Sequence, residues 1–154
     1  MNQNKINFLK SDFIFLLKHL APDALGSWGV MNGQQMVEHF VDVVKTASGK
    51  LKLPMVNEGE RLQKAREFMF SDKPFAENIK NPFISETPPA PRKATMQASI
   101  DKLQQEINYF FDVFENNPSL TTHNAFFGEL DFGGNVHLLY KHARHHLRQF
   151  GLVR

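Results

Sequence analysis

Three histidines have the side-chain chemistry and the spacing to hold one metal ion. His142 and His146 lie four residues apart in the segment Tyr140 to Leu147. Four residues are about one helical turn, so both imidazoles project from one side of a helix with their Cβ atoms roughly 6 Å apart. His39, on another predicted helix, can supply a third nitrogen. Three nitrogen ligands with a free coordination position are typical of a catalytic zinc-type site rather than a structural one.

The other four histidines have weaker claims to this site. His145 points nearly opposite His142 and His146 on the helix, and we expect it to be solvated or to act as a partner of the ligands. We expect His19 to pack at the end of the first helix and His137 to lie toward the basic side of the last helix. His123 lies in a predicted loop that can approach the site.

The sequence does not single out a general base. Glu38 is adjacent to His39 but points away from the three histidines on its helix. Three loop residues remain as candidates, namely Glu129, Asp131 and His123. A general base must come within hydrogen-bond reach of the proton that it removes, so the fold has to decide among them.

An alternative role for the three histidines is ordinary packing. All three lie at the margins of apolar helical stripes, His39 beside Met36 and Phe40 and His146 beside Leu139. Histidines at such margins commonly pack or hydrogen-bond between helices, and no neighbouring glutamate completes an HExxH motif. The spacing alone therefore leaves metal binding and packing both open.

The composition excludes several kinds of chemistry. The chain has 154 residues, of which 42% are hydrophobic and 22% charged, and this length fits one domain over residues 1–154. It contains no cysteine, so disulfides, thiolate ligands and cysteine nucleophiles are excluded and any thiol must arrive with a ligand. The longest early apolar run, Phe13 to Leu17, is too short for a membrane span or signal-peptide core. We therefore expect a cytoplasmic protein without a membrane partner.

The positive charge is slight overall and gathers on one helix face. The net charge is only +2, which is weak support for a nucleic-acid partner, and we expect none. Lys141, Arg144 and Arg148 nevertheless share one face of the last predicted helix, and such a face can bind phosphate. The alternative is a solvated face, because cations near a helix C-terminus suit the helix dipole. No phosphate-binding loop or dinucleotide fingerprint occurs in the sequence.

Apolar residues at intervals of three and four predict the elements that must position the histidines. Four helices are expected, over residues 5–20, 33–48, 96–115 and 134–150. Asn32 and Gln35 form a reciprocal cap at the start of the second helix, and Gly49 and Gly151 are natural stops. The predicted fold is all-α, a four-helix bundle with a long connection between helices two and three.

The long connection, residues 50–94, is expected to lie outside the core. Six prolines interrupt it, namely Pro54, Pro74, Pro82, Pro88, Pro89 and Pro91. A short helix around residues 60–70 is expected within it. A connection of this length often covers a functional site. Strand-like alternation is absent from the pattern, so no sheet is expected.

Several segments resemble the DinB-like superfamily. They are Trp28, Met31-Asn32, Met36-Val37-Glu38-His39 and the ending His142-Ala143-Arg144-His145-His146-Leu147-Arg148-Gln149-Phe150-Gly151. The resemblance covers most of the chain in helix order. It implies a helical bundle with a long second-to-third connection and a divalent metal, zinc or nickel, on His39, His142 and His146. One difference is Gly133-Gly134-Asn135, where the family is expected to have a tryptophan after paired acids.

The resemblance also implies a range of functions. Its members include low-molecular-weight-thiol S-transferases, a thiol-dependent isomerase and metal-dependent hydrolases without a demonstrated substrate, and this chain is most similar to the last group. We therefore expect a hydrolase or thiol transferase acting on a small-molecule substrate, with a homodimer as a further expectation. The alternative is a non-catalytic bundle that holds a small ligand or partner helix around a structural or vestigial metal.

Overall fold

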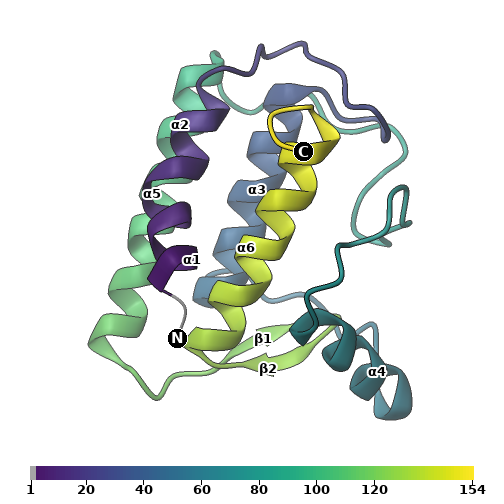
Figure 1. The fold of residues 1–154 in the computed structure, drawn as a ribbon, viewed down its shortest axis with the longest axis vertical. Coiled ribbons are helices and arrows are strands. Elements are labelled where there is room, and N and C mark those ends of the chain that lie inside the picture. The colour runs from purple at the N-terminus through teal and green to yellow at the C-terminus, as the bar shows by residue number, and fades with distance from the viewer. Residues whose placement is uncertain (1–2) are drawn as a thin grey trace.

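The computed structural model describes residues 3–154, in which long helices pack around one main apolar core (Figure 1). The N-terminal arm is continuously helical through α1 (Gln3–Asn7), the π-helical turn η1 (Phe8–Asp12) and α2 (Phe13–Leu17). The other long helices are α3 (Gly33–Ser48), α5 (Met96–Asn116) and α6 (Phe132–Gln149). None of the helices in this described part of the chain has the length and apolar character needed to cross a membrane.

The prediction of an all-α four-helix bundle is wrong. Strands β1 (Thr122–Asn124) and β2 (Gly128–Leu130) form a two-stranded antiparallel sheet, and α4 (Gly59–Phe70) is a further helix. The strands were missed because three residues are too few to show an alternating pattern. Tertiary contacts hold them instead: the Thr122 hydroxyl donates to the Ala47 carbonyl at the end of α3 and accepts from the Asn135 amide of α6.

The short helix expected around residues 60–70 is confirmed as α4, but the connection does not stay wholly outside the interior. Met69, near the end of α4, is fully buried and packs with Leu130 and Leu138 in a second, smaller apolar cluster. Figure 1 shows α4 projecting from the base of the helical body beside the sheet. The end of α4 is thereby fixed against α6, which carries two of the candidate ligands.

Local signals set the boundaries of the two helices that carry the histidines. In α3 both bonds of the predicted capping box form, from the Gln35 amide to Asn32 Oδ1 (2.9 Å) and from the Asn32 amide to Gln35 Oε1 (2.8 Å). Gly49, with φ of 87°, ends the helix as expected. α6 begins earlier than predicted, because the Asp131 side chain accepts from the Gly134 amide and caps the helix at Phe132.

A buried carboxylate fastens α5 to the chain that follows α3. The Glu106 side chain is only 2% exposed and accepts two hydrogen bonds from Lys50 Nζ, at 2.7 and 3.0 Å. Burial alone would raise the pKa of Glu106. The hydrogen bond and charge of Lys50, with the charges of Lys102 and Lys45, outweigh burial and lower that pKa.

Replacing Glu106 should therefore weaken the fold in a pH-dependent way. We expect Glu106→Gln to lower the free energy of unfolding by about 1–2 kcal/mol at neutral pH. The stabilisation by Glu106 is present above its unfolded-state pKa of 4.5 and is lost as pH falls through the lower folded-state pKa. Urea unfolding of the wild type and of Glu106→Gln across this pH range measures the difference, or gap, between their free energies of unfolding. Glu115→Gln, at an exposed position of the same helix, is the control. A gap that persists undiminished in strong acid would contradict the role of the Glu106 charge.

Candidate metal centre

α3 and α6 lie side by side and run in opposite directions, which brings the three predicted ligands together (Figure 1). The ring centroid of His39 lies 5.5 Å from that of His142 and 5.2 Å from that of His146. The His142 and His146 centroids are 4.7 Å apart. One ring nitrogen from each histidine lies within 4.8 Å of the other two. The predicted trio thus forms one cluster in space.

The geometry of this cluster suits a single divalent ion. Nε2 of His142 lies 2.9 Å from Nε2 of His146. Two nitrogen ligands of one tetrahedral zinc ion are about 3.3 Å apart, given Zn–N distances of about 2.0–2.1 Å. The donor set, three imidazoles, is the kind that zinc and nickel accept. Among residues 3–154 no fourth histidine, aspartate or glutamate joins the group, so none of these side chains closes the coordination shell.

Burial keeps the three imidazoles uncharged. Burial lowers the pKa of His39 to about 4, although the nearby Asp42 charge opposes the shift. Burial, with the neighbouring histidines, also lowers the pKa values of His142 and His146 well below the ordinary value. The Phe40 ring contributes to this dry setting, because it packs edge-on against both His142 and His146. A neutral imidazole has a free lone pair, which is what a metal ligand needs.

Gln149 fixes the orientation of one ligand, and sequence reasoning did not assign this role. Gln149 Oε1 lies 2.8 Å from His146 Nδ1, and Gln149 Nε2 donates to the Trp28 carbonyl at 2.9 Å. Because the amide nitrogen is committed to that carbonyl, Oε1 faces the ring and must accept from it. His146 therefore carries its proton on Nδ1 and turns the lone pair of Nε2 toward the cluster. The sequence did contain a signal for this contact, because His146 and Gln149 are three residues apart and so lie on one face of the helix.

The loop between α2 and α3 closes tightly around Gln149. The Ser27 amide donates to the Gln149 carbonyl at 2.7 Å. A Cβ on Gly26 would lie 2.8 Å from Gln149 Cγ. Gly29, whose φ is +80°, would place a Cβ only 2.7 Å from Gln149 Nε2. Glycine is needed at these positions so that the backbone can approach the side chain that holds His146.

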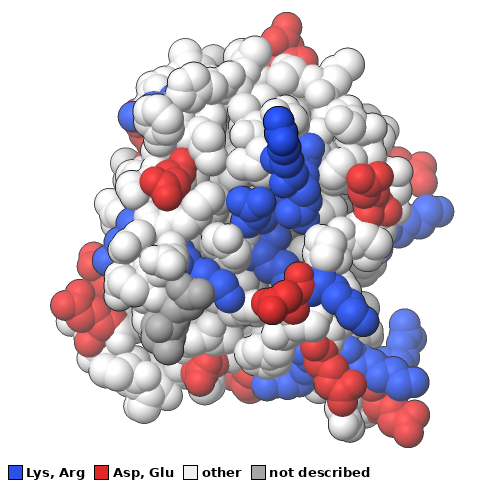
Figure 2. Space-filling view, in the orientation of Figure 1, with Lys and Arg blue, Asp and Glu red and all other residues white. Residues whose placement is uncertain are grey.

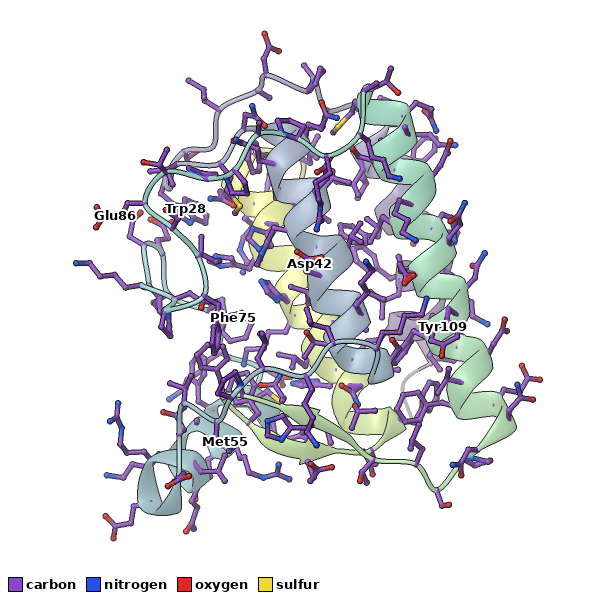
Figure 3. All side chains as sticks on the ribbon, turned by 180° about the vertical axis from the view of Figure 1, so that it is seen from behind. Trp28, Asp42, Met55, Phe75, Glu86 and Tyr109 are labelled. Atoms are coloured by element: carbon purple, nitrogen blue, oxygen red, sulfur yellow. The ribbon has the colours of Figure 1, made fainter. Side chains whose placement is uncertain are left out.

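Aromatic rings form a wall beside the cluster. The Phe75 ring centroid lies 5.8 Å from His142 and 6.0 Å from His145, and the Trp28 ring lies 5.4 Å from His145. Figure 3 shows Trp28 and Phe75 on the same side of the helices. His145 is half-buried between these two rings rather than solvated, with its centroid 5.2 Å from that of His146. The long connection therefore reaches the site through Phe75.

The three loop candidates for a general base do not join the cluster. His123 Nε2 lies 3.0 Å from the Leu53 carbonyl, and its Nδ1 lies 3.5 Å from the Glu129 carboxylate. Asp131 caps the start of α6, eleven residues and about 16 Å along the helix from His142. All three belong to the end of the molecule that holds the sheet.

Glu38 is turned away from the cluster, as its helix position predicted. Its carboxylate accepts from the Arg92 and Lys93 amides and from the Ser99 hydroxyl, at 2.6, 3.2 and 2.7 Å. Burial would raise the pKa of Glu38, but these hydrogen bonds outweigh burial and lower it. The side chain therefore fastens the end of the long connection to α3, one residue from His39.

Comparison of the chain with protein-family models, curated proteins and solved structures gives no match. The case for this centre therefore rests on the three histidines and on the residues that orient them.

The Gln149 hydrogen bond predicts the tautomer of His146. We expect the long-range ¹H–¹⁵N spectrum of the metal-free protein to show a protonated Nδ1 and an unprotonated Nε2 for His146. Gln149→Leu should abolish this preference, because leucine has no acceptor for the Nδ1 proton. Gln104→Leu is the matched control, since Gln104 donates to Asn108, one turn along α5 and away from the histidines. An unchanged His146 signal in Gln149→Leu would contradict the proposed orientation.

Proposed function

We propose that this protein is a metal-dependent enzyme, a hydrolase or a low-molecular-weight-thiol S-transferase. His39, His142 and His146 would hold one divalent ion, zinc or nickel. The observation that carries the proposal is that three neutral imidazole nitrogens lie within 4.8 Å of one another without a fourth histidine, aspartate or glutamate among residues 3–154. Such an ion, when bound, lowers the pKa of a water or thiol and so supplies a nucleophile at neutral pH.

The chain's own residues support this chemistry by orientation and by exclusion of water. Gln149 holds the Nδ1 proton of His146 and so directs Nε2 into the cluster. Phe40 packs against two of the ligands. The rings of Trp28 and Phe75 offer an apolar surface beside the cluster, suited to the organic part of a small-molecule substrate. The resemblance of the His39 and His142–Gly151 segments to the DinB-like superfamily supports the same function.

A thiol cosubstrate would have to come from solution, since the chain has no cysteine. The proposal therefore includes a cytoplasmic location, because low-molecular-weight thiols are kept reduced in that compartment.

The first test is metal content. Protein produced without a histidine tag should contain one equivalent of zinc or nickel per chain, measured by elemental analysis. We expect His142→Ala and His39→Ala to lose it, because two remaining nitrogens bind such ions far more weakly. His19→Ala, at an exposed histidine just after α2, should keep the metal. Circular dichroism would establish that each variant is folded. Equal metal content in wild type and His142→Ala would refute the metal centre.

The second test separates a thiol-using site from one that uses water alone. L-cysteine should bind the zinc-loaded protein saturably in a calorimetric titration, whereas L-serine, which has oxygen in place of sulfur, should not. His39→Ala should remove the heat of cysteine binding. Indistinguishable isotherms for cysteine and serine would rule out the S-transferase and leave the hydrolase.

A further inference from the structure

A basic pocket lies on the side of α6 away from the histidine cluster. It is half open to solvent, has a volume of about 240 Å³ and is bounded by the N-terminal arm, the segment that follows α4, and α6. Figure 2 shows lysine and arginine side chains gathered over α6 on this face. Four cations line the pocket, against the single carboxylate of Asp72; they are Lys5, Lys141, Arg144 and Arg148.

The positive charge of these four cations is only partly compensated, because Asp72 is the one carboxylate of the pocket and its charge acts on Lys141. The ion pairs formed among residues 3–154 involve other side chains in every case. The charges of Arg144 and Arg148 also oppose each other, as their positions one helical turn apart require. Gathering like charges around one hollow costs free energy that an anion in the hollow would recover.

Lys141 has a structural role in this pocket. Its Nζ donates to the carbonyls of Phe68 and Ser71, at 2.8 and 2.9 Å, and lies 3.4 Å from that of Met69. These carbonyls belong to the C-terminal end of α4, where a cation suits the helix dipole. Lys141 thus holds one wall of the pocket in place and adds positive charge behind it.

The remaining cations have donors to offer a ligand. Lys5 Nζ uses one hydrogen to reach His137 Nδ1 at 2.8 Å, while His137 Nε2 donates to the Met69 carbonyl at 2.7 Å. His137 is thereby held as a neutral ring and takes one of the three hydrogens of the Lys5 ammonium, which also faces the Tyr140 ring at 5.5 Å from its centroid. Arg144 makes one long bond of 3.4 Å to the Arg154 carbonyl. The Arg148 guanidinium makes no hydrogen bond within the described part of the chain.

We propose that this pocket binds a phosphate group, either as free phosphate or as a phosphate monoester of a small molecule. Two guanidinium groups and an ammonium match the oxygens of a tetrahedral dianion. The small volume of this half-open pocket favours a small ligand over a nucleic acid, whose backbone needs an extended basic surface. Figure 2 also shows acidic side chains around the basic cluster, which would repel such a backbone. This site is separate from the histidine cluster and does not depend on the proposed function.

The test is a titration with inorganic phosphate followed by ¹H–¹⁵N correlation spectra at constant ionic strength. We expect saturable shifts of the Arg144 and Arg148 side-chain resonances and of nearby amides. Arg148→Gln should weaken binding about tenfold or more, because a charge-assisted hydrogen bond is lost. Arg61→Gln, which removes the same charge from an exposed position of α4 outside the pocket, should bind phosphate like the wild type.

Further arms of the titration identify the source of the phosphate. Tighter binding of glycerol 3-phosphate than of phosphate indicates a monoester, and equal affinities indicate free phosphate. Three results would overturn the proposal. Chloride could reproduce the shifts, Arg148→Gln and Arg61→Gln could lose phosphate affinity equally, or a single-stranded oligonucleotide could bind more tightly than phosphate. The readout does not use bound metal or turnover, so this proposal fails or survives independently of the metal centre.

Discussion

The packing of three uncharged imidazoles between α3 and α6, with His146 buried and His39 and His142 partly buried, is the constraint on which the rest of the site depends. A protonated histidine at the interface of two packed helices would leave a charge in a poorly solvated setting, so burial favours the neutral ring. The pKa of His39 falls to about 4 for this reason. A neutral ring keeps one nitrogen lone pair, and antiparallel packing of the two helices brings one ring nitrogen of each histidine within 4.8 Å of the other two. The fold thereby prepares ligands before any ion is present.

Several features outside the cluster serve this constraint. The capping box at Asn32 and the stop at Gly49 set the length of α3. The Asp131 cap begins α6 two residues earlier than its apolar pattern indicates. Gln149 fixes one ring, and close approach of the loop at Gly26 and Gly29 holds Gln149 in turn. α6 also separates two kinds of surface, with histidines on one side and the phosphate-binding candidates on the other.

The sequence predicted much of this arrangement, and the predictions that were wrong have physical causes. The long helices and the Asn32 cap follow from local periodicity and capping chemistry, and helical spacing brought out the histidine trio. The sheet at Thr122 could not be predicted, because long-range hydrogen bonds rather than local pattern hold its short strands. The role of Gln149 and the aromatic wall at Phe75 depend on how loops return to the helices, which a single sequence does not encode locally. The loop acids and His123 were reasonable candidates until the fold placed them at the far end of α6.

The most direct test of the central claim is a crystal structure of protein produced without a histidine tag, with anomalous diffraction recorded on both sides of the zinc and nickel absorption edges. We expect one anomalous peak between the rings of His39, His142 and His146, within about 2.0–2.2 Å of a nitrogen of each, and a non-protein atom as a further ligand. An absent peak at that position, a peak elsewhere in the chain, or a fourth protein ligand closing the shell would contradict it.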